Sequence, residues 1–118
     1  MSNSWAVEAD PTILERAQFG DTGLIPCIAQ DVTTKAVLMM AWMDLEALTR
    51  TLQEGRVTYF SRSRGEYWRK GDTSGHIQVA RRIRLDCDGD VLLAEVDQSG
   101  PACHTGAPTC FDVGSAGD

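Results

Sequence analysis

Residues 77–98 decide the fold and read IQVARRIRLDCDGDVLLAEVDQ. Two strand-like runs flank an Asp-Gly pair, and Asp-Gly between alternating strands is the strongest short signal for a β-hairpin. In the first run the apolar side chains are predicted to share one face, at Ile77, Val79, Ile83, Leu85 and Cys87. The polar side chains are predicted on the opposite face, at Gln78, Arg82, Arg84 and Asp86. The segment therefore predicts an antiparallel hairpin around the loop DCDGD.

A second hairpin is predicted earlier in the chain, from residues 24–32 (LIPCIAQDV) and 36–43 (AVLMMAWM). The second of these runs is apolar on both faces, so we expect it to be buried. Residues 56–61 and 67–70 predict two more short strands. Strands therefore dominate the predicted fold.

The strongest helix signal is LEALTRTLQE at 45–54, where leucines recur at helical spacing. Asp44 can cap its first turn, and Gly55 stands where a helix commonly ends. A shorter helix is predicted over 12–19, with Asp10 as its cap. The 118 residues are enough for one compact domain. The sequence thus predicts a mainly β, α+β domain with antiparallel strands and one principal helix.

Composition and charge narrow the classes of function. No apolar run approaches the roughly 20 residues that a membrane span needs, and the first ten residues lack the pattern of a signal peptide. A cytoplasmic protein without a membrane partner is expected. The formal net charge of −6 argues against a nucleic-acid partner. Eight of the eleven basic residues, but only two acidic ones, lie between Arg56 and Arg84, which favours a compact anionic ligand.

The loop DCDGD allows three interpretations. A two-residue hairpin turn with solvated acids is one, but in that turn Asp86 would point away from Asp90, and the acids converge only in a wider loop. A calcium-binding EF-hand is another, although Val91 stands where that motif requires glycine and a strand follows in place of a helix. The third is a site for Mg²⁺ or Mn²⁺, which prefer carboxylate oxygens.

The cysteines fall into two groups. Cys27 lies in an apolar run and is expected to be a core thiol. Cys87, Cys103 and Cys110 lie in segments that read as loops, and three thiolates with an open fourth position are typical of a catalytic zinc site. Their spacing is not that of a zinc finger, so unrelated loop thiols are the alternative.

Other polar side chains are candidates for substrate contacts. His104 could transfer protons, bind the metal or be an ordinary loop residue. His76 could contact substrate or only cap a strand. A group of cationic, aromatic and hydroxyl side chains suits the base and phosphates of a nucleotide: Arg62, Arg64, Trp68, Arg69, Lys70, Thr73 and Ser74. Each of these signals is weak alone, and a tryptophan in a short strand is usually a core residue.

Taken in order, SRSRGEYWRKGDTSGH (61–76), RLDCDGD (84–90) and GPACHTGAPTCF (100–111) closely resemble the phosphoribosyl-AMP cyclohydrolases, enzymes of the third step of histidine biosynthesis. The resemblance divides the chain into three parts: an N-terminal extension with a short helix (1–23), a catalytic domain (24–111) and a flexible tail (112–118).

The resemblance also implies an assembly and two metals. It implies an intertwined homodimer with zinc at the subunit interface, bound by Cys87 of one chain and by Cys103 and Cys110 of the other. It implies magnesium on the three acids of the loop, Asp86, Asp88 and Asp90.

The implied substrate is a small nucleotide, 1-(5-phosphoribosyl)-AMP. The implied reaction is hydrolytic opening of the purine six-membered ring at the N1–C6 bond by a zinc-activated water. His104 is our candidate for carrying a proton to the departing nitrogen. The cationic segment and magnesium would hold the phosphates.

Two rival functions follow from the same residues. A zinc nucleobase deaminase needs HxE and PCxxC motifs, but His76 is followed by Ile77 and Gln78, and no two cysteines lie three apart. A non-catalytic zinc-stapled dimerisation or binding module would use the cysteines for folding alone. We also expect the chain to lack the phosphoribosyl-ATP pyrophosphohydrolase domain of bifunctional proteins.

Overall fold

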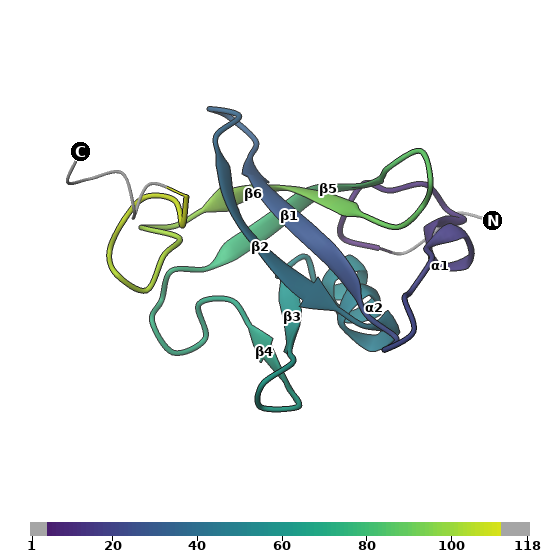
Figure 1. Cartoon of the computed structure of the whole chain (residues 1–118). Coiled ribbons are helices and arrows are strands. Elements are labelled where there is room, and N and C mark those ends of the chain that lie inside the picture. Colours follow the sequence, from purple (N-terminus) through teal and green to yellow (C-terminus); the bar gives the residue numbers. More distant parts are fainter. Residues whose placement is uncertain (1–4, 112–118) are drawn as a thin grey trace.

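Two helices and six strands follow one another along the chain in the computed structural model, which describes residues 5–111 (Figure 1). The helices are α1 (Ile13–Arg16) and α2 (Leu45–Glu54). The strands are β1 (Ile25–Asp31), β2 (Val37–Met43), β3 (Thr58–Ser61), β4 (Glu66–Arg69), β5 (Gln78–Leu85) and β6 (Leu92–Gln98). Neither helix in this part of the chain is long and apolar enough to cross a membrane. The tail predicted at 112–118 lies outside the described residues.

All six strands form one sheet, in the order β4-β3-β2-β1-β6-β5. Both predicted hairpins are confirmed, because β1 pairs with β2 and β5 with β6 in antiparallel fashion. β1 and β6 run parallel, with Cys27 opposite Leu92 and Asp31 opposite Val96. The prediction of a purely antiparallel sheet is therefore wrong at the central pair. Between β1 and β6 the chain passes through β2, α2, β3, β4 and β5, and a connection of this length permits parallel pairing.

A β-bulge interrupts β5 between Ala80 and Arg82, where the pairing with β6 skips Arg81. The extra residue exchanges the two faces of the strand. Gln78 is consequently 0% exposed and faces the core, whereas Val79 lies on the face of Arg82. The side chains before the bulge therefore lie on the faces opposite to those predicted, because the prediction assumed strict alternation along the whole strand.

The core lies between α2 and the sheet (Figure 1). The inward side chains of the two central strands are fully buried: Ile25, Cys27, Ala29, Leu92, Ala94 and Val96. Leu48 and Leu52 of α2 are 0% exposed. The helical spacing of the leucines therefore predicted the apolar face correctly at these two positions, but not at Leu45, which is 52% exposed.

The other face of the sheet, here called the outer face, carries partly open apolar side chains. Met40, Ile28 and Leu93 form a row across β2, β1 and β6. Met40 is 45% exposed and Val37 44% exposed. The prediction that β2 is buried on both faces is wrong. Within the described chain, α2 packs against the opposite face of the sheet and leaves the outer face open (Figure 1).

Residues before β1 pack closely against the sheet. Val7 and Ile13 are 4% and 1% exposed and belong to the core. The predicted short helix is confirmed but contains only four residues, since Thr12 occupies the N-cap position. Asp10 instead accepts the Thr12 backbone N–H at 2.7 Å.

Asp44 joins α2 to the edge strand β4. Its Oδ1 accepts the Ala47 N–H at 2.8 Å, which confirms the predicted cap. Its Oδ2 accepts the Tyr67 O–H at 2.6 Å. This hydrogen bond, together with desolvation, raises the pKa of Tyr67 to about 12. The helix ends as predicted at Gly55, whose φ of 77° suits glycine.

We predict that Asp44→Ala lowers the free energy of unfolding by about 1–2 kcal/mol, because the helix loses its cap. The pKa of Tyr67 should fall toward its ordinary value in the same variant. Urea unfolding and a spectroscopic titration of tyrosine measure the two effects. Asp44→Asn is the matched control, since its amide oxygen can still accept the Ala47 N–H, and equal destabilisation by both variants would contradict the capping role.

Candidate functional site

The loop between β5 and β6, residues 86–91, is here called the acid–thiol loop. Asp86 donates its backbone N–H to the Val91 carbonyl at 3.0 Å, so four residues rather than two complete the hairpin. The interpretation as a two-residue turn is therefore wrong. Gly89 donates to the Asp86 carbonyl at 3.0 Å and has a φ of 78°, which closes a β-turn.

This wider loop brings Asp86 and Asp90 together, but it does not gather all three acids at one metal position. Asp86 Oδ1 accepts the backbone N–H groups of Asp90 at 3.0 Å and Val91 at 3.3 Å. Desolvation opposes ionisation of Asp86, but these hydrogen bonds outweigh it and lower its pKa. Desolvation, together with repulsion from Asp86 and Asp88, raises the pKa of Asp90. A cation placed among these carboxylates would remove the repulsion.

A second cluster lies in the segment after β6, residues 99–111, here called the thiol loop. Cys110 donates its backbone N–H to the Leu38 carbonyl at 2.7 Å, which ties the loop to β2. Thr105 donates its hydroxyl to Cys103 Sγ at 3.2 Å. Thr105 and then Cys110 lower the pKa of Cys103, whereas desolvation and Cys103 raise that of Cys110. The two thiols are therefore close enough to act on one another.

The acid–thiol loop, which contains Cys87, lies at the other end of β6 from the thiol loop (Figure 1). The seven residues of β6 separate the two loops, a distance of about 20 Å. Within residues 5–111 no three His, Cys, Asp or Glu side chains gather at one metal position. Cys27 is 0% exposed, and burial raises its pKa to about 12, so the prediction of a core thiol is confirmed.

A cavity of about 430 Å³, here called the cation cavity, gathers six of the predicted substrate residues: Arg64, Trp68, Arg69, Lys70, Thr73 and Ser74. Lys70 also reaches the thiol loop, where its Nζ donates to the Ala102 carbonyl at 2.7 Å. Ala102 directly precedes Cys103. The cation cavity therefore borders the pair of thiols.

Two of the predicted cations already have partners. Arg69 Nε lies 2.9 Å from Asp72 Oδ1, and Arg69 Nη1 lies 3.5 Å from Glu54 Oε1. Arg62 stacks over the Trp42 ring, with its Cζ 4.6 Å from the ring centroid, and lines a neighbouring cavity of about 570 Å³ that shares Trp68 with the cation cavity. The structure thus does not bring Arg62 into the cation cavity.

Both histidines belong to the thiol-loop end of the molecule. His104 follows Cys103 and is exposed. His76 packs on Gly100, where an added Cβ would lie only 2.6 Å from the His76 ring. The φ of Gly100 is 72°, a region that favours glycine, and a side chain there would also displace the His76 ring.

A buried chain of hydrogen bonds positions these loops, and sequence reasoning missed it. Tyr59 donates its hydroxyl to Gln78 Oε1 at 2.7 Å, and Gln78 Nε2 donates to Gln98 Oε1 at 2.8 Å. Gln98 Nε2 then donates to the carbonyls of His76 and Ser99, both at 3.1 Å. One amide thus joins the segment that ends at His76 to the thiol loop. The sequence did contain a signal for the buried Gln78, because the adjacent Arg81 and Arg82 break the alternation of apolar and polar residues in β5.

Comparisons with known proteins identify related sequences. The family model for phosphoribosyl-AMP cyclohydrolase matches residues 39–112. A phosphoribosyl-AMP cyclohydrolase of Leifsonia xyli subsp. xyli is 65% identical over 100 residues, which cover 85% of this chain and 80% of the relative. One of Streptomyces griseus subsp. griseus is 58% identical over 108 residues, which cover 92% of this chain and 86% of the relative.

The loops of the sheet present thiols, carboxylates and a cavity lined by cations. The chain is also similar to named hydrolases. Together these features define a hydrolytic enzyme. The class can be narrowed further, because the family model and the relatives agree over most of the chain. The protein belongs to the phosphoribosyl-AMP cyclohydrolase family.

We predict that Thr105→Val raises the pKa of Cys103, because the thiolate loses the hydroxyl that stabilises it. A pH titration of the ultraviolet thiolate absorbance of the metal-free protein measures this shift. Thr109→Val is the control, since Thr109 accepts the Phe111 N–H in the same loop. Equal titration curves for the two variants would contradict the role of Thr105.

Proposed function

We propose that this enzyme opens the purine six-membered ring of 1-(5-phosphoribosyl)-AMP by hydrolysis of the N1–C6 bond, the third step of histidine biosynthesis, in the cytoplasm. One observation carries the proposal. Lys70 lines the cation cavity and also donates to the thiol loop beside Cys103, so a nucleotide anchored by its phosphates would extend toward the thiols. The name shared by the relatives supports the same substrate.

We further propose two metals, zinc on Cys87, Cys103 and Cys110 and magnesium on Asp86, Asp88 and Asp90. The donors fit these ions, because thiolates suit zinc and carboxylates suit magnesium. The lowered pKa of Cys103 favours the thiolate, and the mutual repulsion of the acids favours a cation. When bound, zinc would lower the pKa of a coordinated water from about 15.7 toward about 7.

The proposed zinc site requires two chains. The acid–thiol loop and the thiol loop lie at opposite ends of β6, so one chain cannot bring its own three cysteines together. A second copy could pack on the outer face about a two-fold axis perpendicular to the strands. The acid–thiol loop of one chain would then lie beside the thiol loop of the other. The exposed Met40 on that face favours such a partner. A homodimer would then contain two equivalent zinc sites.

The side chains have separate roles in the proposed reaction. Arg64 and Lys70 would bind phosphate, and Trp68 would lie against the base. Ring opening adds the oxygen of water to C6, breaks the N1–C6 bond and leaves a proton on N1. His104, exposed beside Cys103, would carry that proton. N1 bears a ribosyl group, so the ring is already electrophilic.

The purified enzyme should convert phosphoribosyl-AMP with a change in purine absorbance, and His104→Ala should lower kcat by about 100-fold or more, the usual scale for a lost proton-transfer group. Stopped-flow absorbance measures both. Thr109→Val should keep full activity, and zinc content should be the same in all three proteins. A zinc-loaded dimer that leaves the substrate unchanged would favour a non-catalytic binding module instead.

Mixing two inactive variants tests the shared site. Chains with Cys87→Ala and chains with Cys103→Ala should regain activity after subunit exchange, because one site of each mixed dimer contains both intact halves. The recovered activity should reach at most about half per mixed dimer, since symmetry gives two sites. Mixing two Cys87→Ala preparations should recover nothing. If verified mixed dimers stay inactive, the zinc site is not shared between chains.

A further inference from the structure

We propose that residues 13–18, here called the brace, position the acid–thiol loop through one backbone hydrogen bond. Gln18 donates its N–H to the Gly89 carbonyl at 2.7 Å. Gly89 is buried and is the fourth residue of the turn that begins at Asp86. It lies between Asp88 and Asp90 in the chain. The role of the loop in binding magnesium rests on the proposed function, whereas the brace itself is defined by contacts within the chain.

The contact between brace and loop leaves no room for a side chain. A Cβ at Gly89 would lie 2.8 Å from the Arg16 carbonyl oxygen and 3.4 Å from Gln18 Cγ. The φ of Gly89 is 78°, a region that other residues rarely adopt. Two constraints therefore favour glycine here: the backbone conformation of the turn and the close contact with the brace.

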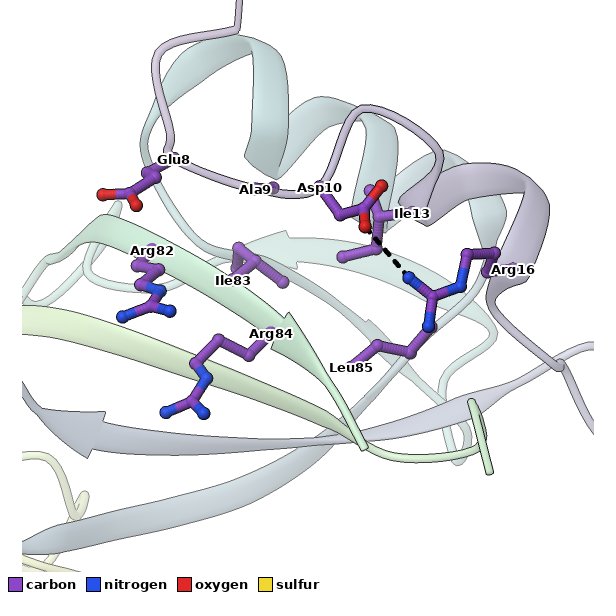
Figure 2. A pocket seen from close by; sticks show the side chains of 9 residues that line it. All are labelled: Glu8, Ala9, Asp10, Ile13, Arg16, Arg82, Ile83, Arg84 and Leu85. Carbon is purple, nitrogen blue, oxygen red and sulfur yellow. Dashed lines mark hydrogen bonds and ion pairs between the residues drawn. The ribbon is translucent and has the colours of Figure 1, made fainter. Parts of the chain in front are cut away.

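The brace is itself held firmly on β5. Glu8 donates to the Arg81 carbonyl at 3.1 Å and accepts the Ile83 N–H at 2.9 Å, so the chain before the brace continues the sheet. Ile13 is 1% exposed and lies over the strand (Figure 2). Arg16 pairs with Asp10 at 3.0 Å within the N-terminal segment, and both residues line a cavity of about 330 Å³ between this segment and β5 (Figure 2).

A fixed Gly89 has a direct consequence for the acids. Asp86 Oδ1 holds the N–H groups of Asp90 and Val91, which follow Gly89 in the chain. The Gly89 carbonyl and the Asp90 N–H belong to one planar peptide, so its rotation would pull the Asp90 N–H away from Asp86 and would also disturb the adjacent Val91 N–H. The Gln18 N–H opposes that rotation. The N-terminal segment thus acts as a positioning element for the carboxylates, although it contains none of them.

The test removes only the backbone donor. Gln18→Pro eliminates the N–H, and the preceding Ala17 already has the extended conformation that proline requires, with φ −66° and ψ 129°. Amide hydrogen exchange of Asp90 and Val91 should accelerate about fivefold in the metal-free full-length protein, as expected for the loss of one hydrogen bond. The Kd for Mn²⁺, measured by electron paramagnetic resonance, should rise by a similar factor.

Two controls separate positioning from general stability. Gln18→Ala keeps the N–H and should match the wild type in both measurements. Thr51→Val removes the hydroxyl that accepts the buried Thr58 N–H at 3.0 Å, so it destabilises the fold far from the loop. It should leave Mn²⁺ binding unchanged. Equal exchange rates for Gln18→Pro and Gln18→Ala, or an equal acceleration by Thr51→Val, would overturn the brace.

Gly89→Ala provides a second route if Gln18→Pro does not fold. Its added methyl group should push the Arg16 carbonyl away and give the same faster exchange at Asp90 and Val91. Unchanged exchange in this variant would also overturn the brace. A wild-type protein that binds no Mn²⁺ would count against the proposed magnesium site alone, because hydrogen exchange still decides whether the brace holds the loop.

Discussion

The parallel pairing of β1 with β6 is the constraint on which the rest of the structure depends. It joins the unit formed by β2, β3 and β4 to the hairpin of β5 and β6, and it places the two most buried strands at the centre of the sheet. Cys27 opposite Leu92 and Ala29 opposite Ala94 bring fully buried side chains together. Burial of this apolar surface holds the two units in one domain.

This central pair also decides where the chemistry lies. The acid–thiol loop and the thiol loop leave opposite ends of β6, so their separation follows from the length of the strand. Within one chain, the carboxylates therefore lie at one end of the molecule, and the cation cavity and the neighbouring thiol loop lie at the other. A site that needs both ends must use a second chain, which gives the proposed homodimer a geometric reason.

The elements that could be predicted are those with local causes. Asp44 and Gly55 cap the two ends of α2, and capping depends only on neighbouring residues. Both hairpins follow from the alternation of apolar and polar residues and from short connections. The cation cavity was predicted in part, since six of the predicted substrate residues line it: Arg64, Trp68, Arg69, Lys70, Thr73 and Ser74. The bulge at Arg81 and the buried Gln78 were not foreseen, because one extra residue reverses the faces of a strand without any change in composition.

The sequence alone determined the family, the strand and helix segments, and the division between a core thiol at Cys27 and loop thiols at Cys103 and Cys110. These properties depend on residue type and on short-range spacing. Only the tertiary structure decided the parallel central pair, the distance between the two loops and the contact of Gln18 with Gly89. Those depend on segments far apart in the chain, whose packing is selected by the burial of the whole core rather than by any single stretch.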